Sequence, residues 1–139
     1  MAIARELLSA YEATDFVVFE HGKEWILKVG APSPRIDALL DRFGADRAIV
    51  VTAFNPRSQV LRPEMNEERH GELVRLLQER GWPFLHGEGR DPAGCWLPET
   101  ECIVLGISLA EGLALARRFD QNAVVHIERG RAPRLEFPE

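Results

Sequence analysis

The chain has 139 residues, of which 45% are apolar and 28% are charged. A chain of this length fits one domain, over residues 1–139, and buries roughly two-thirds of its unfolded surface. The composition excludes a disordered protein. Seventeen basic and 22 acidic side chains give a net charge of −5. This charge argues against nucleic-acid binding, which normally depends on a concentrated positive field.

The cysteines and the apolar runs together predict a cytoplasmic protein. Arg5 and Glu6 stand where a signal peptide would be apolar. The two cysteines, Cys95 and Cys102, are therefore expected to be free thiols in a reducing compartment. No apolar run approaches the roughly 18 residues that a membrane span requires, so no membrane association is expected.

The N-terminal part of the chain predicts a helix, a hairpin and a second helix. Apolar residues at helical spacing place the first helix over residues 2–12. The runs 16–19 and 24–29 are rich in residues typical of strands and are separated by a short turn sequence. In the second helix, Ser33 is the expected cap and Gly44 the expected end.

The remaining elements follow the order β-α-β-β-α-β. This order is that of the split, ferredoxin-like arrangement, so we predict an α+β fold with a mixed or antiparallel sheet. The N-terminal helix, hairpin and helix would be an extension of this unit. The expected elements are a strand at 48–54, a helix at about 63–80, strands at 82–88 and 101–107, a helix from a capping box at 108–111 to about Phe119, a strand at 123–127 and a last strand at 131–137.

This topology brings most of the unusual polar residues to one edge of the sheet. Right-handed crossovers place the loops after 48–54 and 82–88 beside the start of the helix 63–80. Backbone N–H groups and the helix dipole at such a start favour an anion. The predicted ligand-binding residues are Asn55, Arg57, Asn66, Arg69, His70, Trp96, Gln121 and Asn122.

Each of these residues taken alone also has a plain structural explanation. Asn55 could form a turn with its own backbone, Asn66 could cap a helix, and Gln121-Asn122 could end one. Glu88, Asp91, Glu99 and Glu101 could include a pair of carboxyl groups for acid–base chemistry, with Glu99 and Glu88 as the chosen candidates, although surface carboxylates are far commoner than catalytic ones. The sequence therefore leaves open whether the protein is an enzyme.

The sequence does not predict a metal site or indicate a particular cofactor. His86-Gly87-Glu88 is similar to the H-x-E motif of zinc deaminases, but the P-C-x-x-C motif that accompanies it is absent. His70 and His86 have no third ligand at a recognised spacing. There is no dinucleotide fingerprint, P-loop or G-x-S-x-G motif.

An ordered series of motifs resembles the bacterial family named domain of unknown function 3293. The resemblance runs from about Tyr11 to Val125, with Phe54 where tryptophan is expected and Asp120 where glycine is expected. It implies a bacterial, cytoplasmic setting and supports the chosen residues, but the family has no established activity or cofactor. The motifs are Thr52-Ala53-Phe54-Asn55-Pro56-Arg57-Ser58, Asn66 with Arg69, Gly87-Glu88-Gly89, Trp96-Leu97-Pro98-Glu99, Leu105-Gly106-Ile107-Ser108 and Arg118-Phe119-Asp120-Gln121-Asn122-Ala123.

Two functional hypotheses follow from the sequence. The first is a domain that binds a small anionic ligand, such as a nucleotide or sugar phosphate, at the polar edge, either as an enzyme or as a non-catalytic binder. The alternative is a protein-interaction or regulatory module without a ligand site. It would pair through a sheet edge with another protein or with a second copy of itself, as a homodimer. Trp25 and Phe137 would belong to its surface.

Overall fold

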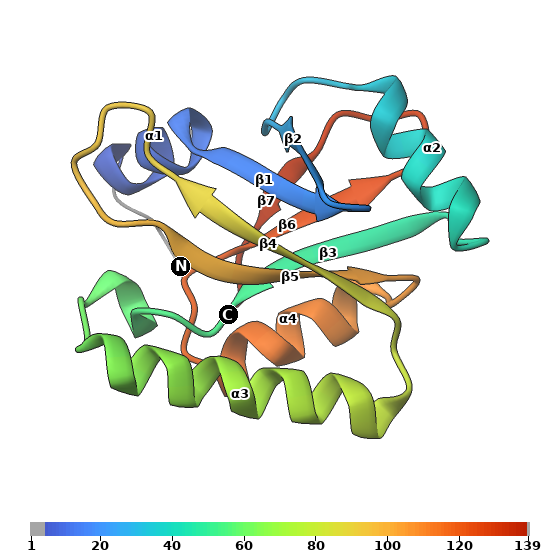
Figure 1. The fold of residues 1–139 in the computed structure, drawn as a ribbon. Helices are drawn as coiled ribbons and strands as arrows, with labels where there is room; N and C mark the ends of the chain where they lie inside the picture. Colours follow the sequence, from blue (N-terminus) through green and yellow to red (C-terminus); the bar gives the residue numbers. More distant parts are fainter. Residues whose placement is uncertain (1–4, 139) are drawn as a thin grey trace.

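The computed structural model describes residues 5–138. Within these residues, seven strands form one curled antiparallel sheet, a half-barrel, in the order β2-β1-β4-β5-β3-β6-β7 (Figure 1). Four α-helices of the same residues cover its two faces, α1 and α2 on one face and α3 and α4 on the other. The protein is therefore of the α+β class.

The N-terminal elements belong to the same sheet as the rest of the chain. They are α1 (Arg5–Ala13), β1 (Asp15–Glu20), β2 (Lys23–Leu27) and α2 (Pro34–Arg42). The predicted first helix included residues 2–4, which lie outside the described residues. Strands β1 and β2 pair as a hairpin, and β1 also pairs with β4. The hairpin thus widens the sheet instead of lying beside it as a separate extension.

The later elements follow the predicted order of strands and helices. They are β3 (Arg47–Thr52), the short 3-10 helix η1 (Pro56–Ser58), α3 (Pro63–Arg80), β4 (Phe84–Arg90), β5 (Glu99–Leu105), α4 (Leu109–Arg118), β6 (Val124–Glu128) and β7 (Arg134–Glu136). Strands β4, β5, β3 and β6 are neighbours in that order, and every pair is antiparallel.

The predicted helix caps are confirmed. Ser33 accepts a hydrogen bond from the backbone of Arg35 at the start of α2. Ser108 and Glu111 form a reciprocal capping box at the start of α4. Gly81 ends α3 with a φ of 68°, a left-handed conformation that glycine adopts at little cost. Local sequence therefore sets these helix ends.

Strands β4 and β5 differ from the prediction, because both are displaced toward the loop that joins them. The prediction ended β4 at residue 88 and began β5 at residue 101, but Gly89 pairs with Glu99. The two glycines of Gly87-Glu88-Gly89 are strand residues. A Cβ at Gly87 would lie 2.3 Å from the backbone oxygen of Val17 in β1. Strand β1 can therefore pack this closely against β4 only if residue 87 is glycine.

Alternating residues of the sheet form two cores, one on each face. On the face of α1 and α2, strand residues such as Val50 and Ile103 pack against Ile36, Leu39 and Leu40 of α2. On the face of α3 and α4, the core contains Ile49, Val51, Leu73, Leu77, Cys102, Val104, Leu115 and Ala116. Trp25, expected on an exposed surface, is in the first core with 7% of its surface exposed. Phe137 is half-buried.

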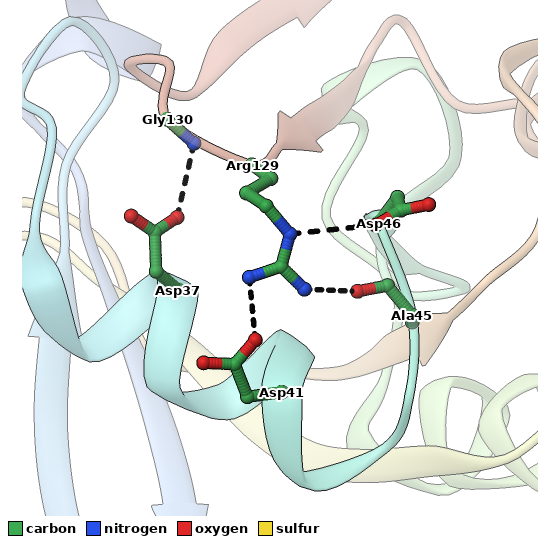
Figure 2. A network of polar contacts seen from close by, with 6 residues as sticks. All are labelled: Asp37, Asp41, Ala45, Asp46, Arg129 and Gly130. Atoms are coloured by element: carbon green, nitrogen blue, oxygen red, sulfur yellow. Dashed lines mark hydrogen bonds and ion pairs between the residues drawn. The ribbon is translucent and has the colours of Figure 1, made fainter.

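Arg129 joins the turn after β6 to α2. Its guanidinium donates to Asp41 Oδ1 at 2.5 Å, while the backbone of Gly130 donates to Asp37 Oδ1 at 3.0 Å. Because Asp37 and Asp41 are one helical turn apart, these contacts fix how α2 lies against the end of the sheet. Figure 2 shows the residues of this network: Asp37, Asp41, Ala45, Asp46, Arg129 and Gly130.

No helix of residues 5–138 is both long enough and apolar enough to cross a membrane. Cys95 is exposed, Cys102 is buried, and both are free thiols.

Candidate functional site

Asn55 is the centre of a hydrogen-bonded cluster at the end of β3. Its Oδ1 accepts from the side chain of Asn66 at 2.8 Å and from the backbone of Leu61 at 2.9 Å. Its Nδ2 donates to Glu99 Oε2 at 2.7 Å. The backbone N–H of Asn55 donates in turn to Asn66 Oδ1 at 2.9 Å. Asn55 thus connects the loop after β3 to α3 and β5.

Arg69 and Gln121 satisfy backbone carbonyl groups of the same region. Arg69 donates to the carbonyl oxygens of Ala53, at 2.7 Å, and Phe119. Gln121 Nε2 donates to Phe54 O at 2.9 Å. Since much of the Arg69 guanidinium is engaged in this way, its role in the structure is to hold two loops together.

The 3-10 segment beside this cluster has an unusual backbone. Asn55, Arg57 and Ser58 have φ values of 46°, 54° and 61°, in the left-handed region that non-glycine residues rarely adopt. Arg57 N donates to the carbonyl oxygen of Asp120 at 2.7 Å, and Asn122 Nδ2 donates to Ser58 Oγ at 3.0 Å. Tertiary hydrogen bonds therefore hold the segment in a conformation that local sequence does not favour.

A cavity of about 240 Å³ opens beside this cluster, between α1 and the sheet. Most of its wall is aliphatic or aromatic, and a few polar groups converge at one end. The lining residues are Leu7, Ala10, Tyr11, Thr14, Phe16, Val50, Thr52, Asn55, Ser58, Val60, Gly89, Trp96, Glu99, Glu101, Gln121, Ala123, Val124, Val125 and Leu135. Even a cavity of about 150 Å³ accepts benzene, so this one has room for a small ring with a substituent.

Gly89 marks the point where three lining groups come together. A Cβ at this position would lie 3.5 Å from Glu101 Oε2, 3.6 Å from Thr14 Cγ2 and 3.9 Å from Trp96 Cη2. These three residues come from β5, the end of α1 and the loop between β4 and β5, which lies beside α1 in Figure 1. The cavity is therefore built from segments far apart in sequence.

Two carboxyl groups, Glu99 and Glu101, lie on the same face of β5 and line the cavity. Burial raises the pKa of Glu99, and the hydrogen bond from Asn55 opposes this rise. Burial, and then the charges of Glu99 and Glu88, raise the pKa of Glu101 well above its ordinary value. Burial therefore favours the neutral form of Glu101, and a neutral carboxyl group can donate a hydrogen bond.

Glu101 also carries the one polar group of the cavity that is clearly unsatisfied. Its side chain is buried, and its Oε1 has no hydrogen-bond partner among the residues that the structure describes. A buried polar atom without a partner is unfavourable by about 1–3 kcal/mol. This oxygen is the best place on the cavity wall for a polar group of a ligand.

Aromatic groups complete the polar end of the cavity. Burial, followed by the charge of Glu99, raises the pKa of Tyr11 to about 12, while hydrogen bonds with Asn122 and Ser58 act in the opposite direction. Trp96, which is half-buried, lines the cavity as well. Two carboxyl groups beside Trp96 and Tyr11 form a site that suits a cation more than an anion.

The predicted site residues divide into two groups. Asn55, Trp96, Glu99 and Gln121 line the cavity. The others do not: Asn66, Arg69 and Asn122 support loops, Arg57 is exposed beside Asp120, Glu88 pairs with Arg90, and His70 contacts His86 on the opposite face. Because Arg57 and Arg69 lie outside the cavity, its described lining contains no basic side chain, and the reason to expect an anion is lost.

Tyr11 and Thr14 were not among the predicted site residues, and Glu101 was only one of four carboxylates considered for acid–base chemistry, not one of the two chosen. Glu101 had a visible signal, because it is an acidic residue directly before the apolar run 102–105. Tyr11 and Thr14 had none, since only the tertiary position of α1 places them at the cavity.

Replacing Asn55 by alanine should destabilise the protein by about 3 kcal/mol. The change removes three side-chain hydrogen bonds, leaves buried partners unsatisfied, and puts alanine at a left-handed φ. Urea denaturation measures the loss. Asn122→Ala is the matched control and should cost clearly less, because it removes an exposed hydrogen bond with Ser58 and one with Tyr11, and Asn122 is not at a left-handed φ. Equal losses would mean that Asn55 is not the centre of the cluster.

Comparison with known proteins identifies a family and nothing beyond it. A model of the family described as "Protein of unknown function (DUF3293)" matches residues 51–124. No match was found among curated proteins or among solved structures. The matched segment contains Asn55, Trp96, Glu99 and Glu101, whereas Tyr11 lies outside it.

Proposed function

We propose, for a chain that belongs to the DUF3293 family of proteins of unknown function, that the cavity binds a small amine with an apolar body. The observation that carries this proposal is the buried carboxyl of Glu101, whose Oε1 has no partner among the described residues. An ammonium group at this position would satisfy the oxygen and would favour the ionised form of the carboxyl.

The remaining wall of the cavity fits the two ends of such a ligand. Glu99 and the ring of Trp96 lie at the polar end, and a cation is attracted both by a carboxylate and by an aromatic face. Phe16, Val50 and Leu135 supply an apolar wall for the body of the ligand. A nucleotide or sugar phosphate is disfavoured, because it would meet two carboxyl groups and no basic side chain among the described lining residues.

The two carboxyl groups also have complementary acid–base chemistry. Glu101 is held neutral by burial, and Glu99 accepts a hydrogen bond from Asn55. Two carboxyl groups in such different environments can donate and accept a proton at the same ligand. We propose Glu99 and Glu101 as the acid–base pair instead of Glu99 and Glu88, because Glu88 forms an ion pair with Arg90 and does not line the cavity.

The test is a thermal-shift screen of small aromatic and aliphatic amines against nucleotides and sugar phosphates. An amine at a hundred times its dissociation constant should stabilise the protein by about 2.7 kcal/mol. In Glu101→Gln the affinity for the amine should fall at least tenfold, while the distant Gly71→Ala variant keeps it. Stabilisation by phosphates alone, or unchanged amine affinity in Glu101→Gln, would contradict the proposal.

We also place β3 to β6, with α3 and α4, in the ferredoxin-like class. Support comes from the neighbour order β4-β5-β3-β6, which is that of a split β-α-β-β-α-β unit. The alternative function, an interaction module that pairs through a sheet edge, has weaker support. Of its two surface residues, Trp25 is buried and Phe137 is half-buried.

A further inference from the structure

Two histidines and a cysteine meet on the face of α3 and α4, across the sheet from the cavity. His86 of β4 and Cys102 of β5 are direct cross-strand partners, so their side chains project from the same face. His70 of α3 lies over them, and the centroids of the two imidazole rings are 5.2 Å apart. One ligand atom from each of the three residues lies within 4.8 Å of the others.

We infer that His70, His86 and Cys102 form a zinc-binding site with an open fourth position. Imidazole nitrogen and thiolate sulfur are ligands that Zn²⁺ prefers, and three protein ligands with one open position are typical of a reactive zinc site. Zinc bonds of about 2.0–2.3 Å place tetrahedral ligand atoms roughly 3.4–3.7 Å apart. The ligand atoms, which lie within 4.8 Å of one another, therefore need to approach by at most roughly 1.1–1.4 Å.

The state of His70 is an independent reason to expect a ligand here. The residue is 9% exposed, and its Nδ1 is buried with no hydrogen-bond partner among the described residues. Such an unsatisfied nitrogen requires an explanation in a folded protein.

The exposure of the three residues gives the site an entrance. Cys102 is fully buried, whereas His86 is exposed, so an ion and its water ligand can enter beside His86. Zinc binds cysteine as the thiolate, so binding at Cys102 releases the thiol proton.

Aromatic packing is the competing explanation for the position of the histidines. The ring of Phe54 meets His70 edge-on with centroids 6.3 Å apart, and Phe84 meets His86 at 5.5 Å. These contacts account for the positions of the two imidazole rings. They do not account for a thiol at the same point or for the unsatisfied nitrogen of His70.

The experiment is titration of the chelator-treated, full-length protein with Co²⁺ and then with Zn²⁺. One equivalent of Co²⁺ should produce a thiolate-to-cobalt charge-transfer band in the near ultraviolet, and Zn²⁺ should displace it. The band should be absent in Cys102→Ala and retained in Cys95→Ser, which removes the other cysteine. In His86→Ala the affinity for Zn²⁺ should fall at least about 100-fold, because loss of even an outer-shell partner costs 10–100-fold.

The choice of His86 keeps the test decisive, since this exposed side chain can be removed without opening the core. His21→Ala, at an exposed turn, is its matched control and should bind as the unmodified protein does. No cobalt band in the unmodified protein would overturn the assignment. A band that survives in Cys102→Ala, or zinc affinity that is unchanged in His86→Ala, would overturn it as well.

Discussion

Gly87→Ala should destabilise the protein by about 3 kcal/mol or more. A Cβ at this position would lie 2.3 Å from the backbone oxygen of Val17 and 2.8 Å from Ile103 Cδ1. The side chain of Ile103 can rotate away, but the oxygen belongs to β1 and moves only if β1 separates from β4. Overpacking alone costs about 1–3 kcal/mol, and disruption of a central strand pair adds to it. Urea denaturation of the two proteins measures the difference.

Gly89→Ala is the matched control, since it is the same change on the same face of the same strand. A Cβ there meets nothing closer than 3.5 Å, and its φ is not in the left-handed region. We expect a change in stability of less than about 1 kcal/mol. The added methyl group narrows the cavity between Glu101 and Trp96, so the affinity for an amine should fall in a folded protein. Equal destabilisation of both variants would show that strand propensity, and not the contact with Val17, decides the effect.

These two glycines also explain why the end of β4 could not be predicted from the sequence. Glycine is usually depleted in strands, and a segment with two of them predicts a turn. The strand continues through Gly87 and Gly89 because β1 packs closely against it, and β1 lies about 70 residues earlier in the chain. A requirement that comes from so distant a segment leaves no local pattern. Local signals did fix the caps of α2 and α4, whose partners lie within three residues.

The sequence predicted the region of the candidate site but not the role of every residue in it. The order of the elements brought Asn55, Asn66, Glu99 and Gln121 into one region. There, hydrogen bonds join Asn55 to Asn66 and Glu99, and Gln121 donates to the backbone of the neighbouring Phe54. The sequence did not indicate that Arg69 would be engaged by backbone carbonyl groups, which removes it as a support for the predicted anionic ligand. The role of an arginine depends on which carbonyl groups the fold leaves unpaired, and this is a property of the packed loops.

The cysteine and the two histidines illustrate a third kind of limit. His86 and Cys102 are 16 residues apart in sequence, which matches no recognised zinc spacing. They are neighbours because the register of β4 and β5 makes them so. A shift of one residue in this register would place them on opposite faces. Since the predicted strand ends were displaced by two residues, the pairing could not be read from the sequence.

Glu101→Gln should stabilise the protein, and the gain should increase as the pH rises. The folded-state pKa of Glu101 lies well above the ordinary value of 4.5, so the folded state keeps a proton that the unfolded state releases. The unmodified protein therefore loses about 1.4 kcal/mol of stability per pH unit through this group, from about pH 4.5 up to the folded pKa. Because glutamine does not ionise, the Glu101→Gln variant loses no stability through this position as the pH rises.

Urea denaturation of both proteins at pH 4, 5, 6 and 7 measures this effect. The free energies of unfolding of the two proteins should be similar at pH 4. Above pH 4 they should diverge by about 1.4 kcal/mol per pH unit, up to the folded-state pKa. Glu111→Gln is the control with the opposite sign, because hydrogen bonds with Ser108 lower the pKa of Glu111 and make its charged form the stabilising one. A constant difference between Glu101→Gln and the unmodified protein would mean that Glu101 is ionised in the folded state. If Glu101→Gln is more stable than the unmodified protein and yet no longer binds an amine, its loss of affinity cannot come from unfolding. The loss would then be a direct effect on the ligand site.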